Sequence, residues 1–308
     1  LLGTEPDVFS SIFSEMDGES VDSSLSDNED YIALMERCGD SGDLHASVLL
    51  TNLADTLMQL DSSGMGMLMV LPMLKSAIGD IDGLAETVSF SPSDDILLSG
   101  KYAILMSEGR NGLMALVGSE VPRAQIPKFV GEDTVSYAQV QINYDKITTW
   151  FKEMVEGNPM LSMQMNPQIM EQIESMISMY TIPLGKETHI ISSGNLPYTA
   201  ETIGYLVAVE CVDEEQLSNV LGLMMPSMGA VPADFLGNQI FTIDLEPSMT
   251  MPVEMSFSIA VGGGYALFGT SNSVENALRT IANPKSSKKN HGVNAATALL
   301  SSSDVSSW

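Results

Sequence analysis

The sequence has few basic residues. Thirteen Lys and Arg stand against 40 Asp and Glu, which gives a formal net charge of −27. A surface of this charge repels phosphate backbones and anionic lipid headgroups, so we expect neither nucleic-acid binding nor a polybasic membrane anchor. Two explanations of the acidity stay open: solubility, and a surface that binds cations or a basic partner.

Cysteine and long apolar runs are also scarce. Cys38 and Cys211 lie far apart in sequence and belong to no Cys-x-x-Cys pattern, so they are either small buried hydrophobes or the two halves of one bridge. The longest uncharged apolar stretch is Ser62–Leu74, which contains Pro72 and is too short to cross a bilayer. We therefore expect a soluble segment with no transmembrane part in this chain.

Catalytic and metal-binding motifs are missing. The three histidines form no His-x-x-Glu-His pattern, so His45 and His189 are interpreted as structural residues. No Gly-x-Ser-x-Gly elbow occurs, and Gly262–Gly264 favours a hairpin turn over a phosphate loop. Asp80–Gly83 matches the middle of a calcium loop, but position twelve falls on Ser89, which excludes an EF-hand. We expect no enzyme, no cofactor and no metal centre, with only a looser calcium site, here or in the acidic stretch 27–30, left open.

Two kinds of periodicity predict the fold class. Asn166–Pro167 is typical of a helix start, and apolar residues then recur on one face as far as Tyr180. Residues 253–261 alternate strictly between apolar and polar and lead through three glycines into residues 265–268, which predicts a hairpin. Further helices are expected at 6–16, 28–37, 53–60, 71–78, 147–155, 214–224 and 273–282, and strands at 44–50, 86–91, 100–106, 135–142, 187–193, 203–210 and 238–245. The pattern predicts an α+β fold with antiparallel sheets, helices packed on one face and two related lobes.

Internal similarity suggests how the lobes are arranged. Leu1–Val8 matches Leu267–Val274 at four of eight positions, and both lead into an amphipathic stretch. A fainter match relates residues 45–50 to 137–142, at an offset of 92. We predict one lobe over residues 1–130, of which 1–19 complete a preceding repeat unit, and a second over 131–308, of which 284–308 start the next unit.

The Gly264–Ser271 segment, Gly-Tyr-Ala-Leu-Phe-Gly-Thr-Ser, is followed by a helical pattern. In this respect the chain resembles uncharacterised exported proteins of bacterial envelopes, in which α+β units recur. The resemblance implies an extracytoplasmic location, in the periplasm or cell envelope, and carries no catalytic residues. We expect a non-enzymatic repeat module with a structural or protein-interaction role, whose partners are other proteins or neighbouring repeat units.

Methionine is abundant, with 22 residues, and it provides a different hypothesis. Methionine mostly fills cores, but a cluster of thioethers also lines adaptable apolar cavities, and only rarely binds Cu(I). The alternative function is therefore a carrier for a hydrophobic ligand such as a lipid or acyl chain. Its cavity would be lined by Met65, Met67, Met69, Met170, Met176 and Met179.

Overall fold

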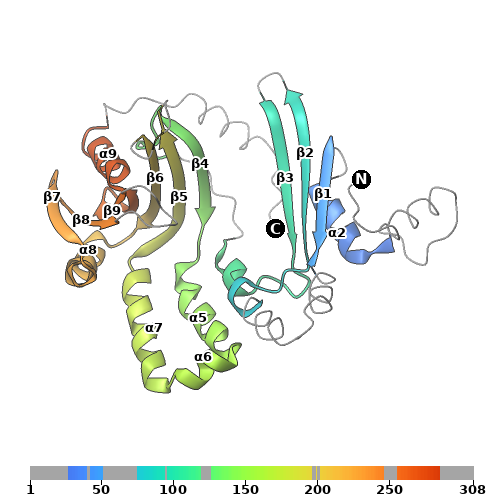
Figure 1. The fold of residues 1–308 in the computed structure, drawn as a ribbon, viewed down its shortest axis with the longest axis horizontal. Coiled ribbons are helices and arrows are strands. Elements are labelled where there is room, and N and C mark those ends of the chain that lie inside the picture. The colour runs from blue at the N-terminus through green and yellow to red at the C-terminus, as the bar shows by residue number, and fades with distance from the viewer. Residues whose placement is uncertain are drawn as a thin grey trace. The chain divides into compact units, whose positions relative to one another are not determined.

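The structure, a computed structural model, describes residues 27–39, 42–50, 75–93, 96–118, 126–195, 199, 202–245 and 255–284. The chain divides into two compact units, Leu1–Gly112 (unit 1) and Leu113–Trp308 (unit 2) (Figure 1). The sequence predicts lobes that meet at residues 130 and 131, just after the proline-containing stretch 121–127. The expected helices at 6–16 and 53–60, and the repeat copy at 1–8, lie outside the described residues.

Over its described residues, unit 1 is built on a three-stranded antiparallel sheet packed against a helix. The strands lie in the order β1 (Leu44–Leu49), β2 (Gly83–Ser93) and β3 (Ile96–Leu105), and α2 (Glu29–Cys38) covers one face. The helix begins where Asn28 accepts a hydrogen bond from the Tyr31 amide, and it ends at Gly39. Its inner face buries Leu34 and Cys38 against the sheet.

Unit 2 contains a seven-stranded antiparallel sheet in the order β4-β5-β6-β10-β9-β8-β7. Its strands are β4 (Thr134–Gln141), β5 (Leu184–Gly194), β6 (Ile203–Cys211), β7 (Val231–Phe235), β8 (Asn238–Leu245), β9 (Met255–Gly262) and β10 (Tyr265–Thr270). Its helices are α5 (Ile147–Glu156), α6 (Pro159–Gln164), α7 (Pro167–Thr181), α8 (Glu214–Met224) and α9 (Ser271–Ala282). The α+β class and the antiparallel sheets are confirmed.

In the part of the chain that the structure describes, a helix covers one face of the sheet in unit 1, whereas helices cover both faces in unit 2. Helix α9 packs on the face that carries Ala208 and Leu267, whereas α8 packs on the opposite face, with Val209 and Ala266. The polar face of β9, which carries Ser258, lies beneath α9. The Ser258 hydroxyl has partners there, since it lies 2.8 Å from the hydroxyl of Thr242 on β8 and 2.8 Å from that of Ser271 on α9.

The β9–β10 hairpin forms as predicted. Gly262 pairs with Tyr265, so the turn consists of Gly263 and Gly264. Both have positive φ, 65° and 83°, a conformation that glycine adopts without the steric cost of a Cβ. The hairpin places β10 between β9 and β6 at the centre of the sheet.

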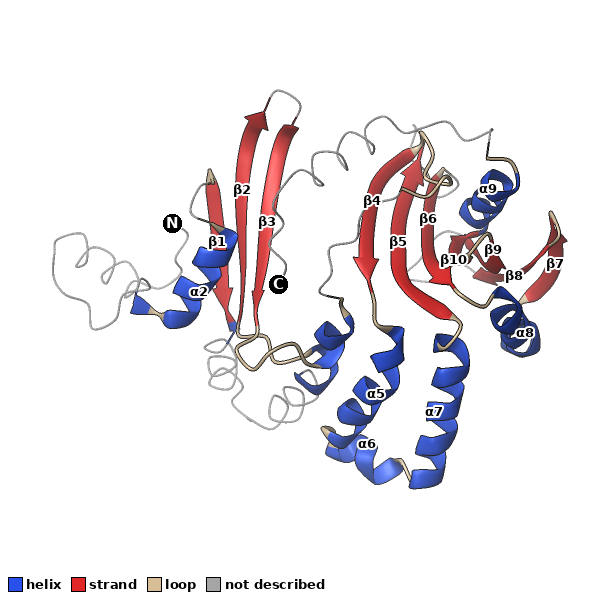
Figure 2. Cartoon of the chain, turned by 180° about the vertical axis from the view of Figure 1, so that it is seen from behind, coloured by secondary structure: helices blue, strands red, loops and turns tan. Residues whose placement is uncertain are grey.

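The connection between β4 and β5 consists of the helices α5, α6 and α7, which extend from one end of those strands (Figure 2). Asn166 caps α7 as predicted, accepting a hydrogen bond from the Ile169 amide at 2.9 Å. No side chain of α7 is buried, and Trp150 of α5 is only half-buried. The two helices are joined by an ion pair between Lys152 and Glu174.

The first three strands of the two units correspond. In each unit they pair consecutively and antiparallel, and the segment before the first strand covers one face: α2 in unit 1, and residues 126–133 in unit 2. When the two sequence segments are aligned at the offset of 92, Ser47 corresponds to Gln139. Strand pairing then aligns the row Ser47, Ala85 and Ala103 with the row Gln139, His189 and Ala208.

Candidate functional site

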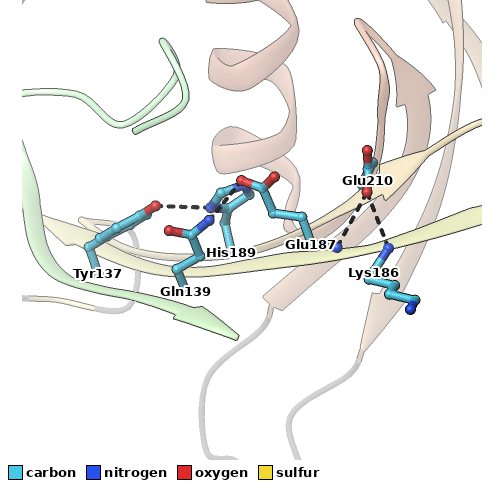
Figure 3. Close-up of polar contacts among 6 residues, drawn as sticks. All are labelled: Tyr137, Gln139, Lys186, Glu187, His189 and Glu210. Carbon is cyan, nitrogen blue, oxygen red and sulfur yellow. Dashed lines mark hydrogen bonds and ion pairs between the residues drawn. The ribbon is translucent and has the colours of Figure 1, made fainter. Parts of the chain in front are cut away.

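The most distinctive group of polar side chains lies on β4 and β5 of unit 2. Tyr137 and Gln139 are two residues apart on β4, as are Glu187 and His189 on β5, so each pair points to the same face. Gln139 lies directly opposite His189 in the antiparallel pairing. We call these four residues the His189 cluster (Figure 3).

Two hydrogen bonds join the His189 cluster across the strands. The Tyr137 hydroxyl lies 2.9 Å from Nδ1 of His189, and Nε2 of Gln139 donates to Oε1 of Glu187 at 2.8 Å. Nε2 of His189 also lies 2.9 Å from Oε1 of Glu187, but the angles are not those of a hydrogen bond. Nε2 of His189 and Oε1 of Gln139 are therefore buried without a hydrogen-bond partner.

Aromatic rings enclose the imidazole of His189, which has no solvent exposure. Tyr137 stacks on it at 5.9 Å between ring centroids, while Phe129 and Tyr265 approach it edge-on at 6.5 Å and 5.7 Å. Phe129 belongs to the segment that precedes β4, and Tyr265 begins β10. Two parts of the chain that are distant in sequence, residues 129–137 and the start of β10, thus enclose one histidine.

A second carboxylate lies beside the His189 cluster. Oε2 of Glu210, on β6, accepts hydrogen bonds from the backbone amides of Lys186 and Glu187 at 3.1 Å and 3.4 Å. The pairing of β5 with β6 is irregular between Leu184 and Thr188, and these amides lie in that irregular stretch. Gly185 leaves the space, since a Cβ there would lie within 2.1 Å of the same carboxylate oxygen.

Burial controls the ionisation of the His189 cluster. It lowers the pKa of His189 from 6.5 to about 4, although the carboxylate of Glu187 alone would raise it. Burial, and then the negative charge of Glu210, raises the pKa of Glu187. Burial also raises the pKa of Tyr137 well above its ordinary value, with a further contribution from the charge of Glu187. At neutral pH the imidazole and the phenol are both uncharged.

The charge of Glu187 suggests where the imidazole proton lies. A proton on Nε2 faces the carboxylate of Glu187, and the Tyr137 hydroxyl then donates to Nδ1. The reverse tautomer would direct the lone pair of Nε2 at that carboxylate. In this arrangement the imidazole has no direct contact with solvent, and its nearest partly exposed neighbour is the carboxylate of Glu187.

The pocket found in unit 2 lies elsewhere on the same face, with a volume of about 400 Å³. It lies between α9 and the segment that precedes β4, and His189 does not line it. Its lining is mostly polar, including Asp133, Ser193, Asn276 and Arg279. Arg279 pairs with Glu275 at 3.1 Å and lies over the ring of Phe235, so its charge already has partners within the fold.

The methionines of the carrier alternative are only partly described. Met65, Met67 and Met69 lie outside the described residues. On α7, Met170 is half-buried, while Met176 and Met179 are 44% and 43% exposed. None of these three lines the pocket above.

Other residues considered from the sequence have local roles. Asp80 pairs with Lys75 at 2.7 Å, and Asp82 accepts a hydrogen bond from the Ser107 amide. His45 is exposed and lies 3.0 Å from the Thr87 hydroxyl. Cys38 and Cys211 are both buried and free, which resolves the alternative that the sequence left open. Over the described residues, no group of three or more His, Cys, Asp and Glu side chains is arranged to hold a metal ion.

The sequence contained a signal for the His189 cluster that we did not use. Tyr137-x-Gln139 and Glu187-x-His189 are polar pairs at the spacing that shares one strand face, each beside apolar residues. Their proximity depends on the register of β4 against β5, and the 42 residues between those strands do not fix that register.

No family model matches the chain, and neither the curated proteins nor the solved structures include a significant match. In the part of the chain that the structure describes, no helix combines the length and apolar character needed to cross a membrane.

Proposed function

We propose that this chain belongs to a non-enzymatic repeat protein with a structural or protein-interaction role outside the cytoplasm, in a bacterial envelope. The observation that carries the proposal is the recurrence of one arrangement in both units. Three consecutive antiparallel strands lie under the segment that precedes them in each case. Recurrence of a unit along a chain is how proteins build extended scaffolds and binding surfaces.

An interaction role is supported by the open face of the sheet in unit 1. Seven exposed apolar residues point away from α2, whereas a solvated sheet face is normally polar. They are Leu44, Val48, Leu84, Phe90, Leu98, Tyr102 and Ile104. Glu86 lies among them, and Val88 on the same face is buried. Phe90 and Tyr102 are 58% and 67% exposed. A face of this kind is suited to a protein partner or a neighbouring unit.

The interaction role can be tested with a photoreactive amino acid at Phe90, in the native bacterium. We expect one saturable cross-link to a defined protein or to another copy of the chain. The matched control carries the same group at Glu153, an exposed charged position on α5 in unit 2. A cross-link to lipid, or equal labelling from both positions, would contradict the role and favour the carrier for a hydrophobic ligand.

The location can be tested with a single surface thiol. Because Cys38 and Cys211 are both buried, a Glu153→Cys variant adds the only cysteine that we expect a bulky maleimide to label in the folded protein. A maleimide that passes the outer membrane but not the inner one should label this variant in intact cells. Labelling only after the inner membrane is broken would place the chain in the cytoplasm and overturn this part of the proposal.

A further inference from the structure

The two units differ in what pairs with their third strand, β3 in unit 1 and β6 in unit 2. In unit 2, β6 lies inside the sheet with β5 on one side and β10 on the other. Strand β3 is its counterpart in unit 1, yet among the described residues it pairs with β2 alone. The first strands β1 and β4 both lie at a sheet edge, so this difference does not extend to them.

The β3 edge also has few of the features that protect a sheet edge. Short length, proline, bulges and inward charges are the usual means of preventing an edge from pairing with another strand. Strand β7, at the end of the sheet in unit 2, has five residues and includes Pro232 and Asp234. Strand β3 has ten residues, no proline and a single charged side chain, Lys101. It is long enough, and regular enough along residues 98–105, to accept a partner.

Strand β10, which pairs with the outer side of β6, shows what a fourth strand added at this edge requires. Gly269 of β10 lies opposite Leu206, and a Cβ at Gly269 would lie 2.0 Å from the Tyr205 carbonyl oxygen and 3.0 Å from the Leu206 Cα. Glycine is therefore needed for β10 to approach β6. The sequence Leu-x-Gly-Thr that ends β10 occurs again at residues 1–4, so it is a repeated element of the sequence.

We propose that the outer edge of β3 binds an antiparallel strand of the β10 type, supplied by another unit of the same kind. The correspondence of Ala103 with Ala208 fixes the register. The incoming glycine lies opposite Lys101, and the leucine two residues before it lies opposite Ala103. The added strand extends the three-stranded sheet as β10 extends β4-β5-β6. This inference rests on the proposed repeat architecture, and it names the partner that one edge accepts.

The test uses the full chain and a synthetic peptide with the sequence of residues 264–271, followed by amide hydrogen exchange at single residues. We expect the β3 amides that are not bonded to β2 to slow by about tenfold or more when the peptide is saturating. Amides along the outer edge of β4 serve as the internal control and should not change. Equal exchange along β3 with and without the peptide would overturn the inference.

Three altered peptides make the result specific. A Gly269→Val peptide should give no protection, because its Cβ would collide with the backbone of β3. N-methylation of the peptide amides on one edge should abolish protection, while methylation of the alternate amides should leave it intact. Equal protection by the valine peptide would indicate non-specific hydrophobic adsorption and reject the inference. The repeat architecture is tested separately by the strand register within the chain, so failure of the two ideas can be distinguished.

Discussion

The first three strands of unit 1 and unit 2 pair in the same order, but different side chains lie beneath the segment that covers them. In unit 1, the central strand presents Ala85 to α2, beside Ala103 and Leu105. At the corresponding position unit 2 has His189, with Tyr137, Gln139 and Glu187 around it. The same three-stranded arrangement thus accepts an apolar or a polar interior, provided that most of the buried polar groups find partners. In the apolar interior of unit 1 a histidine would lack such partners, so a substitution there measures their contribution to stability.

The largest effect should come from placing histidine in unit 1. Ala85→His introduces an imidazole beneath α2, where Ala85 is 5% exposed and its neighbours are apolar. Overpacking together with an unsatisfied polar group should destabilise unit 1 by about 3–5 kcal/mol. Hydrogen exchange along β2 during denaturant titration measures the loss.

The control for this change is Ala46→His on β1, where the side chain is exposed and points to the other face. Its effect should stay within about 0.5 kcal/mol, as for ordinary surface substitutions. If both variants lose the same stability, the interior of unit 1 does not distinguish histidine from alanine, and the comparison of the two interiors fails.

A smaller effect should appear when unit 2 is acidified. The unfolded chain has a histidine pKa of about 6.5, whereas burial lowers that of His189 to about 4, so the unfolded state binds the proton first. The stability due to neutral His189 is complete above pH 6.5 and is lost as the pH falls to 4. The loss should be roughly 2 to 3 kcal/mol, measured by denaturant melts that follow Trp150 fluorescence.

Glu187 has the opposite effect on the pH dependence of stability in the same pH range. Its pKa is raised in the folded state, so its contribution to stability falls as the pH rises above 4.5 and through the folded pKa. The pKa shift of His189 is the larger of the two, so the net stability should fall with decreasing pH, as the histidine dictates. His189→Gln should flatten the slope of stability against pH between pH 4 and 6.5. A slope that survives His189→Gln would assign the acid response to other residues.

A third test concerns the helical connection between β4 and β5. Trp150 is only half-buried on α5, so Trp150→Ala should cost about 1–2 kcal/mol, below the 3–5 kcal/mol of a fully buried aromatic residue. Circular dichroism during denaturant titration measures the change without relying on tryptophan fluorescence. A loss above about 4 kcal/mol would show that α5 to α7 belong to the core of unit 2.

The smallest effect on stability should come from Glu187→Gln. The change removes both the repulsion from Glu210 and the carboxylate beside Nε2 of His189, and the side chain is one-third exposed. We expect less than about 1 kcal/mol at pH 7, together with a further decrease in the pKa of His189, because a negative neighbour favours the charged imidazole. Nuclear magnetic resonance titration of the imidazole measures the pKa, and an increase would contradict the arrangement.

Much of the secondary structure was predictable because its signals are local. Asn166–Pro167 marks the start of α7, and Gly263–Gly264 marks the turn of the β9–β10 hairpin. Strand β7 was missed because it is short, is largely exposed and contains Pro232, all of which argue against a strand. Helix α6 was missed because six residues contain too few turns to show a period.

The arrangement of layers was harder to predict than the elements. Ser256 and Ser258 indicated a polar face on β9, yet Ser258 is 1% exposed, and Thr242 and Ser271 satisfy its hydroxyl. The His189 cluster depended on register in the same way, since its members come from strands separated by three helices. Local patterns predict which residues share a face, but they do not show what covers that face.

The first three strands of both units share one register, and cross-strand nuclear Overhauser contacts measured on the full chain test this register. Ala85 should lie between Ser47 and Ala103, and His189 between Gln139 and Ala208, with both sets antiparallel. A shift of one residue in either unit would move its side chains to the other face and would contradict the correspondence of Ala85 with His189.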